Sequence, residues 1–129
     1  MPGRRVGARI KAFAPDAIHI ATEGPLGLAA NRYCRSRGLA FTTSYHTRFP
    51  EYVHARCRLP LGLSYAFLRW FHGAAHRVMV ATRTIEDALT ERGFTNIGRW
   101  TRGVDTTQFR PVDNRLLNLP GPILLYTGR

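Results

Sequence analysis

The chain has 129 residues, of which 44% are hydrophobic, and this composition fits one globular domain rather than a disordered protein. It has no stretch of the roughly 18 to 20 uninterrupted apolar residues that a membrane span needs, and its basic N-terminus lacks the apolar core of a signal peptide. We therefore expect a cytoplasmic protein.

The net charge of +11 comes from eighteen arginines and a single lysine. It is compatible with a surface that binds nucleic acid, a surface that lies against anionic lipid, or a solvated surface with a few functional arginines. The dispersal of the arginines along the chain favours the third interpretation. The two cysteines, Cys34 and Cys57, lack metal-ligand spacing, so we expect them to be packing residues and expect no metal and no cofactor.

The first half of the chain predicts two helices and two strands. Apolar spacing predicts a helix over 4–13, followed by a strand over 17–21. A second helix begins at Pro25, where the missing N–H costs nothing, and ends at Gly38. A β-rich run over 41–45 then predicts the next strand.

The middle of the chain predicts a long helix that is apolar on two sides. Residues 48–58 are expected to form a mixed polar and aromatic connection, with one or two helical turns as an alternative, and Pro60 begins the helix. The stripe expected in the core comprises Leu63, Ala66, Phe67, Trp70, Phe71 and Ala74. A second stripe comprises Leu61, Tyr65 and Leu68. Such a helix needs a partner on each side, and deep burial within the protein is the favoured interpretation. Beyond the sheet, the second side could instead contact another helix, a lipid-like acceptor or a membrane surface.

The alternation of strands and helices continues with a strand over 78–81, a short helix capped by Thr84 and ended by Gly93, and a strand over 96–100. This order is typical of right-handed βαβ units. It predicts an α/β fold with a Rossmann-like, doubly wound and mostly parallel sheet.

The last part of the chain has a looser pattern and predicts a domain boundary. We expect the main domain to occupy 1–111, without its first strands, and 112–122 to be a linker. Residues 123–129 would then supply the first strand of a truncated second domain.

Polar residues follow the predicted strands. His46 ends the strand over 41–45, and Glu23-Gly24 stands between the first strand and the Pro25 helix. Because parallel strands place their carboxyl ends at one edge, where ligands bind, these side chains are expected to share a site.

Motifs in the same order as in a known family accompany these positions. They are Glu23-Gly24-Pro25, Thr43-Ser44-Tyr45-His46-Thr47, Phe49-Pro50-Glu51-Tyr52, Arg102-Gly103-Val104-Asp105 and Phe109-Arg110-Pro111. The chain thereby resembles the retaining glycosyltransferases of the family-4 type, nearest the mannosyl- and sulfoquinovosyl-transferases that act on lipid or glycolipid acceptors. Those enzymes have the B-type fold, in which two Rossmann-like domains face each other across a cleft. The resemblance covers most of the first domain, which binds the acceptor.

The resemblance implies transfer of a hexosyl group, of mannosyl or glucosyl type, from a nucleotide-diphosphate sugar to a lipid or glycan acceptor with retention. Such catalysis relies on positioning and on stabilising the charge of the leaving diphosphate. It implies a cytoplasmic enzyme, with a peripheral contact with the anionic inner membrane face as a further expectation, and no nucleic acid as partner. This chain alone, without the donor domain, is expected to be inactive.

The resemblance also assigns roles to individual residues. His46 is the catalytic candidate, which reaches the transferred sugar. The donor diphosphate would be bound by Gly128 and Arg129. The acceptor or sugar would be contacted by Glu23, Gly24, Arg48, Glu51 and Tyr52. The hinge would comprise Arg102, Gly103 and Asp105. Two other functions remain open, a basic nucleic-acid-binding module and a non-catalytic sugar- or lipid-binding domain.

Overall fold

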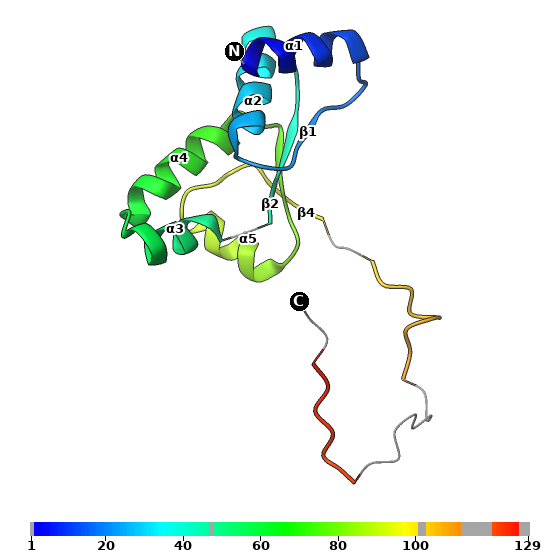
Figure 1. The fold of residues 1–129 in the computed structure, drawn as a ribbon. Helices are drawn as coiled ribbons and strands as arrows, with labels where there is room; N and C mark the ends of the chain where they lie inside the picture. The colour runs from blue at the N-terminus through cyan, green and yellow to red at the C-terminus, as the bar shows by residue number, and fades with distance from the viewer. Residues whose placement is uncertain (1, 47, 101–102, 112–119, 127–129) are drawn as a thin grey trace.

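The core of the protein is a four-stranded parallel sheet whose strands follow chain order (Figure 1). The computed structural model describes residues 2–46, 48–100, 103–111 and 120–126. The strands are β1 (His19–Ile20), β2 (Thr42–Tyr45), β3 (Arg77–Val80) and β4 (Ile97–Arg99). All three neighbouring pairs are parallel, which confirms the predicted α/β class and the shared edge. The described strands progress in one direction across the sheet.

Five helices complete the described fold. They are α1 (Pro2–Phe13), α2 (Pro25–Arg37), α3 (Phe49–Cys57), α4 (Leu61–Gly73) and α5 (Arg83–Thr90). α2 joins β1 to β2, the α3–α4 pair joins β2 to β3, and α5 joins β3 to β4. Helical connections of this kind are what parallel neighbouring strands require.

The hydrophobic core lies between one face of the sheet and helices α2, α4 and α5. One cluster joins Ile20 of β1 to Cys34 of α2 and Phe71 of α4. A second cluster joins Val78 and Val80 of β3 to helices α4 and α5; its members are Tyr45, Tyr65, Leu68, Val78, Val80, Leu89 and Phe94. Alternate strand residues point to the other face, where His19 hydrogen-bonds the hydroxyl groups of Thr42 and Ser44.

The two sides of α4 are the reverse of the sequence prediction. Tyr65, Leu68 and Phe71 are buried, together with the polar Ser64 and His72. The stripe predicted to be core is exposed apart from Phe71, with Leu63 at 62% and Trp70 at 44%. His72 is accommodated on the buried side because both of its ring nitrogens have hydrogen-bond partners there, which apolar periodicity does not reveal, whereas the buried hydroxyl of Ser64 has no partner among the described residues.

Three smaller differences concern the connection before α4, the cap of α5 and the environment of His19. Residues 49–57 form a full helix where a connection was expected. Thr82, rather than Thr84, caps α5, because its side chain accepts a hydrogen bond from the backbone N–H of Ile85. His19 lies within the strand predicted over 17–21, and both of its ring nitrogens are hydrogen-bonded although the residue is exposed.

The strand predicted over 123–126 is not present, since residues 120–126 carry no regular secondary structure. This segment runs apart from the sheet (Figure 1). A strand needs a neighbour that takes up its backbone hydrogen bonds, and the sheet provides none at that position.

Candidate active site

The carboxyl edge of the sheet collects the polar residues that follow the strands. Ile20 of β1 lies opposite Thr43 of β2 in the register, and Glu23 and His46 each stand three residues beyond that pair. These two candidates therefore follow the carboxyl ends of two neighbouring strands that run in the same direction. The predicted meeting of the strand ends is confirmed by this register.

Glu23 is held by a buried histidine of α4. The ring of His72 is fully buried, and its Nε2 lies 3.2 Å from Oε1 of Glu23, whose side chain is 21% exposed. Nδ1 of the same ring lies 2.8 Å from the hydroxyl of Thr43, which is also buried. Because a carboxylate only accepts hydrogen bonds, Nε2 carries the proton and donates to Glu23.

This chain of hydrogen bonds runs from the core to the sheet edge. Phe71 and Phe94 surround the His72 ring, with ring centroids 5.0 Å and 6.2 Å away. Apolar surroundings make each polar contact of His72 costly to lose. The Glu23 carboxylate thus has a fixed place at the edge, with part of its surface open to a ligand.

The start of α2 lies close to the same edge. Gly24 is the N-cap residue, has extended backbone and donates its N–H to the hydroxyl of Thr22. A Cβ on Gly27 would overlap the carbonyl oxygen of Thr22, so only glycine allows α2 to approach the end of β1 so closely. The first backbone N–H groups of α2 have no side-chain cap, so they can donate to an anion or a hydroxyl.

His46 is an exposed residue directly after β2. It makes no hydrogen bond to the other described residues. Its imidazole is therefore available to donate or accept a hydrogen bond from a ligand at this edge.

Arg48 and Glu51 both line a small cavity between β2 and helices α3, α4 and α5. The cavity is lined by Tyr45, Arg48, Glu51, Tyr65, Ile85, Ala88, Leu89 and Arg92. Oε1 of Glu51 accepts a hydrogen bond of 2.6 Å from the hydroxyl of Tyr65. Its other oxygen, Oε2, is buried and has no hydrogen-bond partner among the described residues. A buried carboxylate oxygen of this kind can accept a hydrogen bond from a ligand hydroxyl.

The two tyrosines of the cavity stay protonated well into alkaline conditions. Burial raises the pKa of Tyr65, and its hydrogen bond to Glu51 raises the pKa further. Burial likewise raises the pKa of Tyr45, and so does the neighbouring Tyr65. The guanidinium of Arg92 lies 4.4 Å from the Tyr65 ring centroid and completes the cavity wall.

The remaining predicted site residues lie elsewhere. Tyr52 is 55% exposed, outside the cavity, and its ring contacts the guanidinium of Arg56. Asp105 accepts hydrogen bonds from Thr107 and Gln108, which lower the pKa of its carboxyl group, so it organises a local turn. Gly103 is exposed. Arg102, Gly128 and Arg129 lie outside the described residues.

Sequence reasoning missed three residues of this site. His72 has no partner residue at ligand spacing in the sequence, yet it bonds Glu23, which lies 49 positions away. Tyr65 was counted as apolar, although its hydroxyl bonds Glu51. Arg92 was not considered. A buried polar side chain on a core helix stripe is the signal that marks His72 and Tyr65.

Two further observations concern metal binding and membrane-spanning helices. Within the described ranges, no group of three histidine, cysteine, aspartate or glutamate residues is placed to hold a metal ion. None of the described helices combines the length and apolar character needed to cross a bilayer.

The fold is an α/β domain with a parallel sheet and with polar residues at the carboxyl ends of its strands. The profile of Glycosyltransferase Family 4 matches residues 2–108. The chain belongs to this family, and the resemblance found in its motifs is confirmed at that level.

Three curated relatives carry the name GDP-mannose-dependent alpha-mannosyltransferase. The chain is 26% identical over 136 residues to a GDP-mannose-dependent alpha-mannosyltransferase of Mycobacterium tuberculosis, which covers 100% of this chain and 36% of the relative. Enzymes of the same printed name from Corynebacterium glutamicum and Mycolicibacterium smegmatis are 27% and 24% identical over 112 residues, 86% of the chain. The chain spans 27% and 30% of their lengths. No solved structure matches the chain.

Proposed function

We propose that the chain is the acceptor-side domain of a hexosyltransferase. The parent enzyme would move a mannosyl- or glucosyl-type group from a nucleotide-diphosphate sugar to a lipid or glycan acceptor, with retention of the anomeric configuration. The proposal is supported by membership of Glycosyltransferase Family 4 and by relatives named GDP-mannose-dependent alpha-mannosyltransferases.

The observation that carries the proposal is that Glu23 and His46 follow the carboxyl ends of two neighbouring parallel strands. In this assignment the exposed imidazole of His46 hydrogen-bonds a hydroxyl of the transferred sugar. Glu23, fixed by His72, accepts a hydrogen bond from a second hydroxyl. Two directional contacts of this kind orient a sugar, and orientation is the main contribution such an edge can make to catalysis.

The Arg48–Glu51 cavity is assigned to the acceptor. In this assignment the buried Oε2 of Glu51 accepts a hydrogen bond from a hydroxyl of the acceptor molecule, and Arg48 offers N–H donors to an anionic group. Tyr52 is removed from this assignment because it lies outside the cavity. Arg102, Gly103 and Asp105 stay assigned to the hinge, and Gly128 and Arg129 to the donor diphosphate.

The chain covers about a third of its first relative, so we propose that activity requires a donor-binding partner domain in the parent protein. The isolated 129-residue chain should be inactive with nucleotide sugars. We further propose that nucleic acid is not a partner of this site.

The test is transfer of labelled hexose from GDP-mannose or UDP-glucose to a lipid extract by the natural gene product that contains this chain. NMR of the product gives the anomeric configuration. His46→Ala should lower turnover about 100-fold, the typical effect of losing one positioned donor, without lowering stability comparably. Absence of transfer from every nucleotide sugar, or equal losses of activity and stability, would disprove the assignment.

A further inference from the structure

Helices α1 and α2 enclose a groove at the end of the domain opposite to α3 and α5 (Figure 1). A Cβ on Gly7 of α1 would overlap the ring of Tyr33 on α2, so the two helices lie in close contact and this ring forms part of the floor. The groove has a volume of about 870 Å³. Because sites for small molecules measure roughly 300–1,000 Å³, it has room for a ligand of that size. We call it the α1–α2 groove.

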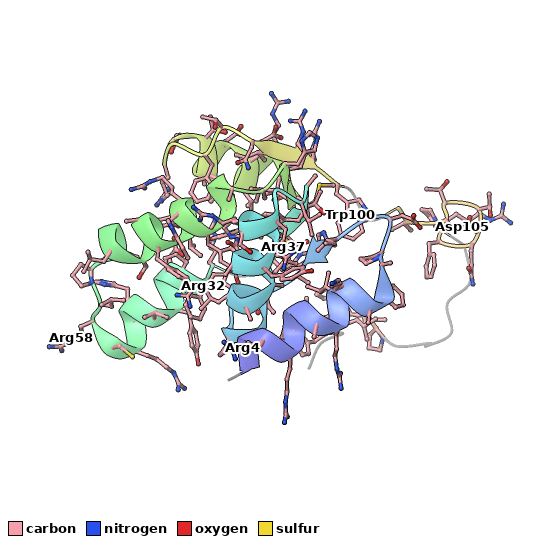
Figure 2. The ribbon with its side chains drawn as sticks, turned by 90° about the horizontal axis from the view of Figure 1, so that it is seen from above. Arg4, Arg32, Arg37, Arg58, Trp100 and Asp105 are labelled. Carbon is pink, nitrogen blue, oxygen red and sulfur yellow. The ribbon has the colours of Figure 1, made fainter. Side chains whose placement is uncertain are left out.

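Both walls of the α1–α2 groove carry cations. α1 contributes Arg4 and Lys11, and α2 contributes Arg32 and Arg37. Figure 2 shows Arg4 at the start of α1, next to α2 with Arg32 and Arg37. Arg4 and Lys11 are seven positions apart, which is about two helical turns or roughly 10 Å along one side of α1. All four side chains are exposed, so a ligand in solution can reach them.

No acid of the two helices neutralises these cations, because neither α1 nor α2 contains aspartate or glutamate. The ion pairs between described residues join His72 to Glu23 and Arg99 to Glu86, and neither includes a cation of the groove. The like charges of the two walls therefore face one space without a counter-charge from the described residues, and an anion in that space would relieve their repulsion.

We propose that the α1–α2 groove binds an oligophosphate, which is a chain of three or more phosphate groups, either as inorganic tripolyphosphate or as the triphosphate of a nucleotide. The planar guanidinium of arginine offers paired N–H donors that match the oxygens of a phosphate group. Cations spread over two turns of α1 need several anionic groups in a row, because a single phosphate group reaches only part of the groove.

The lining of the groove favours phosphate groups over other anionic partners. The Tyr33 ring is covered by Gly7 and has the guanidinium of Arg37 at 5.8 Å from its centroid, so it is not available to stack on a base. Besides Tyr33, the one large apolar side chain among the lining residues is Leu28. A protein partner generally binds through several buried aromatic or large aliphatic anchors. We therefore expect recognition of charge and not of a base or of an apolar surface.

An occupied groove would act on the sheet edge through α2. Pro25, the first residue of α2, lines the groove, and Glu23 stands two residues before it. α2 is tied to its surroundings, because Gly27 lies against the Thr22 carbonyl and the buried Asn31 donates a hydrogen bond of 2.8 Å to the carbonyl oxygen of Phe71 on α4. The proposal does not rest on glycosyl transfer, since anion binding is measured without donor or acceptor.

The first experiment titrates sodium tripolyphosphate into the full chain by isothermal titration calorimetry at constant ionic strength. Tripolyphosphate should bind at least about tenfold more tightly than orthophosphate or sulfate, because several charge-assisted hydrogen bonds form at once. ATP should bind about as tightly as tripolyphosphate, and adenosine should not bind. In NMR spectra, the amide signals of α1 and α2 should shift on binding, whereas those of α5 should stay in place.

The second experiment compares two variants that lose the same charge. Arg4→Gln with Arg32→Gln removes one cation from each wall and should weaken tripolyphosphate binding by about tenfold or more. The matched control is Arg58→Gln with Arg83→Gln, two exposed arginines outside the groove, and it should change the affinity by less than about twofold.

Circular dichroism checks that each variant folds, and Lys11→Gln with Arg37→Gln gives a second pair from the same two walls if the first does not. Equal losses in the groove and control variants would overturn the proposal, because net charge alone would then attract the anion. So would tripolyphosphate binding no tighter than that of sulfate. Binding of phosphatidylglycerol vesicles, an acidic peptide or GDP-mannose that the groove variant abolishes while tripolyphosphate affinity stays unchanged would also reject it.

Discussion

Replacing His72 by leucine isolates the energetic role of the Glu23–His72–Thr43 chain. Leucine keeps most of the volume of the ring, so a large cavity is avoided, but both polar contacts of the ring are lost. The hydroxyl of Thr43 is fully buried and would be left without its partner.

The size of the effect follows from these contacts. A buried hydroxyl without a partner costs about 1–3 kcal/mol, and a hydrogen bond to a charged group contributes about 1.5–3 kcal/mol. The Glu23 side chain is 21% exposed and can hydrogen-bond water once His72 is gone. The loss of the His72–Glu23 hydrogen bond therefore contributes at the low end of the range for a charged group. We expect His72→Leu to lower the free energy of unfolding by about 2–4 kcal/mol.

The assay is urea unfolding followed by far-UV circular dichroism, for His72→Leu, Thr43→Val and the double variant. Thr43→Val removes the hydroxyl and keeps the shape, so the double variant should be less destabilised than the sum of the two single variants. The coupling between directly bonded side chains should be about 0.5–3 kcal/mol. A His72→Leu protein as stable as the wild type, or additive single effects, would refute the hydrogen-bonded chain.

Three further predictions concern backbone fit and pH. Gly27→Ala should destabilise the protein by about 1–3 kcal/mol, because its Cβ overlaps the Thr22 carbonyl; Gly62→Ala, with open space around the new Cβ, should be neutral or stabilising in the same urea assay. Gly38→Ala should cost about 1 kcal/mol by urea unfolding, because Gly38 ends α2 in the left-handed conformation at φ 64°, and a smaller effect than that of Gly62→Ala would contradict this. Since the raised pKa of Tyr65 lies above that of the unfolded chain, stability should fall as pH rises above about 10, where the unfolded tyrosine ionises first. Urea unfolding between pH 9 and pH 11 should show a smaller decline for Tyr65→Phe, and an equal decline would reject this explanation.

The parallel sheet could be predicted from the sequence because its signals are local. Pro25 at a helix start, Gly38 at a helix end and short apolar strands between them define βαβ units without any knowledge of distant contacts. Parallel order then places His46 and Glu23 at one edge, as the register confirms. Among the four strands and helices α2, α4 and α5, only the ends of elements differ from the prediction, as with the Thr82 cap of α5.

The polar interior could not be predicted in the same way. His72 and Ser64 are buried on α4, while Leu63 and Trp70 are exposed, and hydropathy alone favours the opposite arrangement. His72 is tolerated inside because its partner Thr43 stands 29 positions earlier, on a strand that the helix covers. A contact at such a separation leaves no periodic signal in the sequence.

The inner face of α4 connects both carboxylates of the candidate site to one helix. Tyr65 holds Glu51 and His72 holds Glu23, and the two residues are seven positions apart, which is about two helical turns on the same side. A shift of α4 along its axis would therefore move both hydrogen-bond donors together. The outward Phe67 contacts the buried Phe71, with ring centroids 6.3 Å apart, so the outer side of α4 is coupled to the core through side chains as well as through the helix backbone.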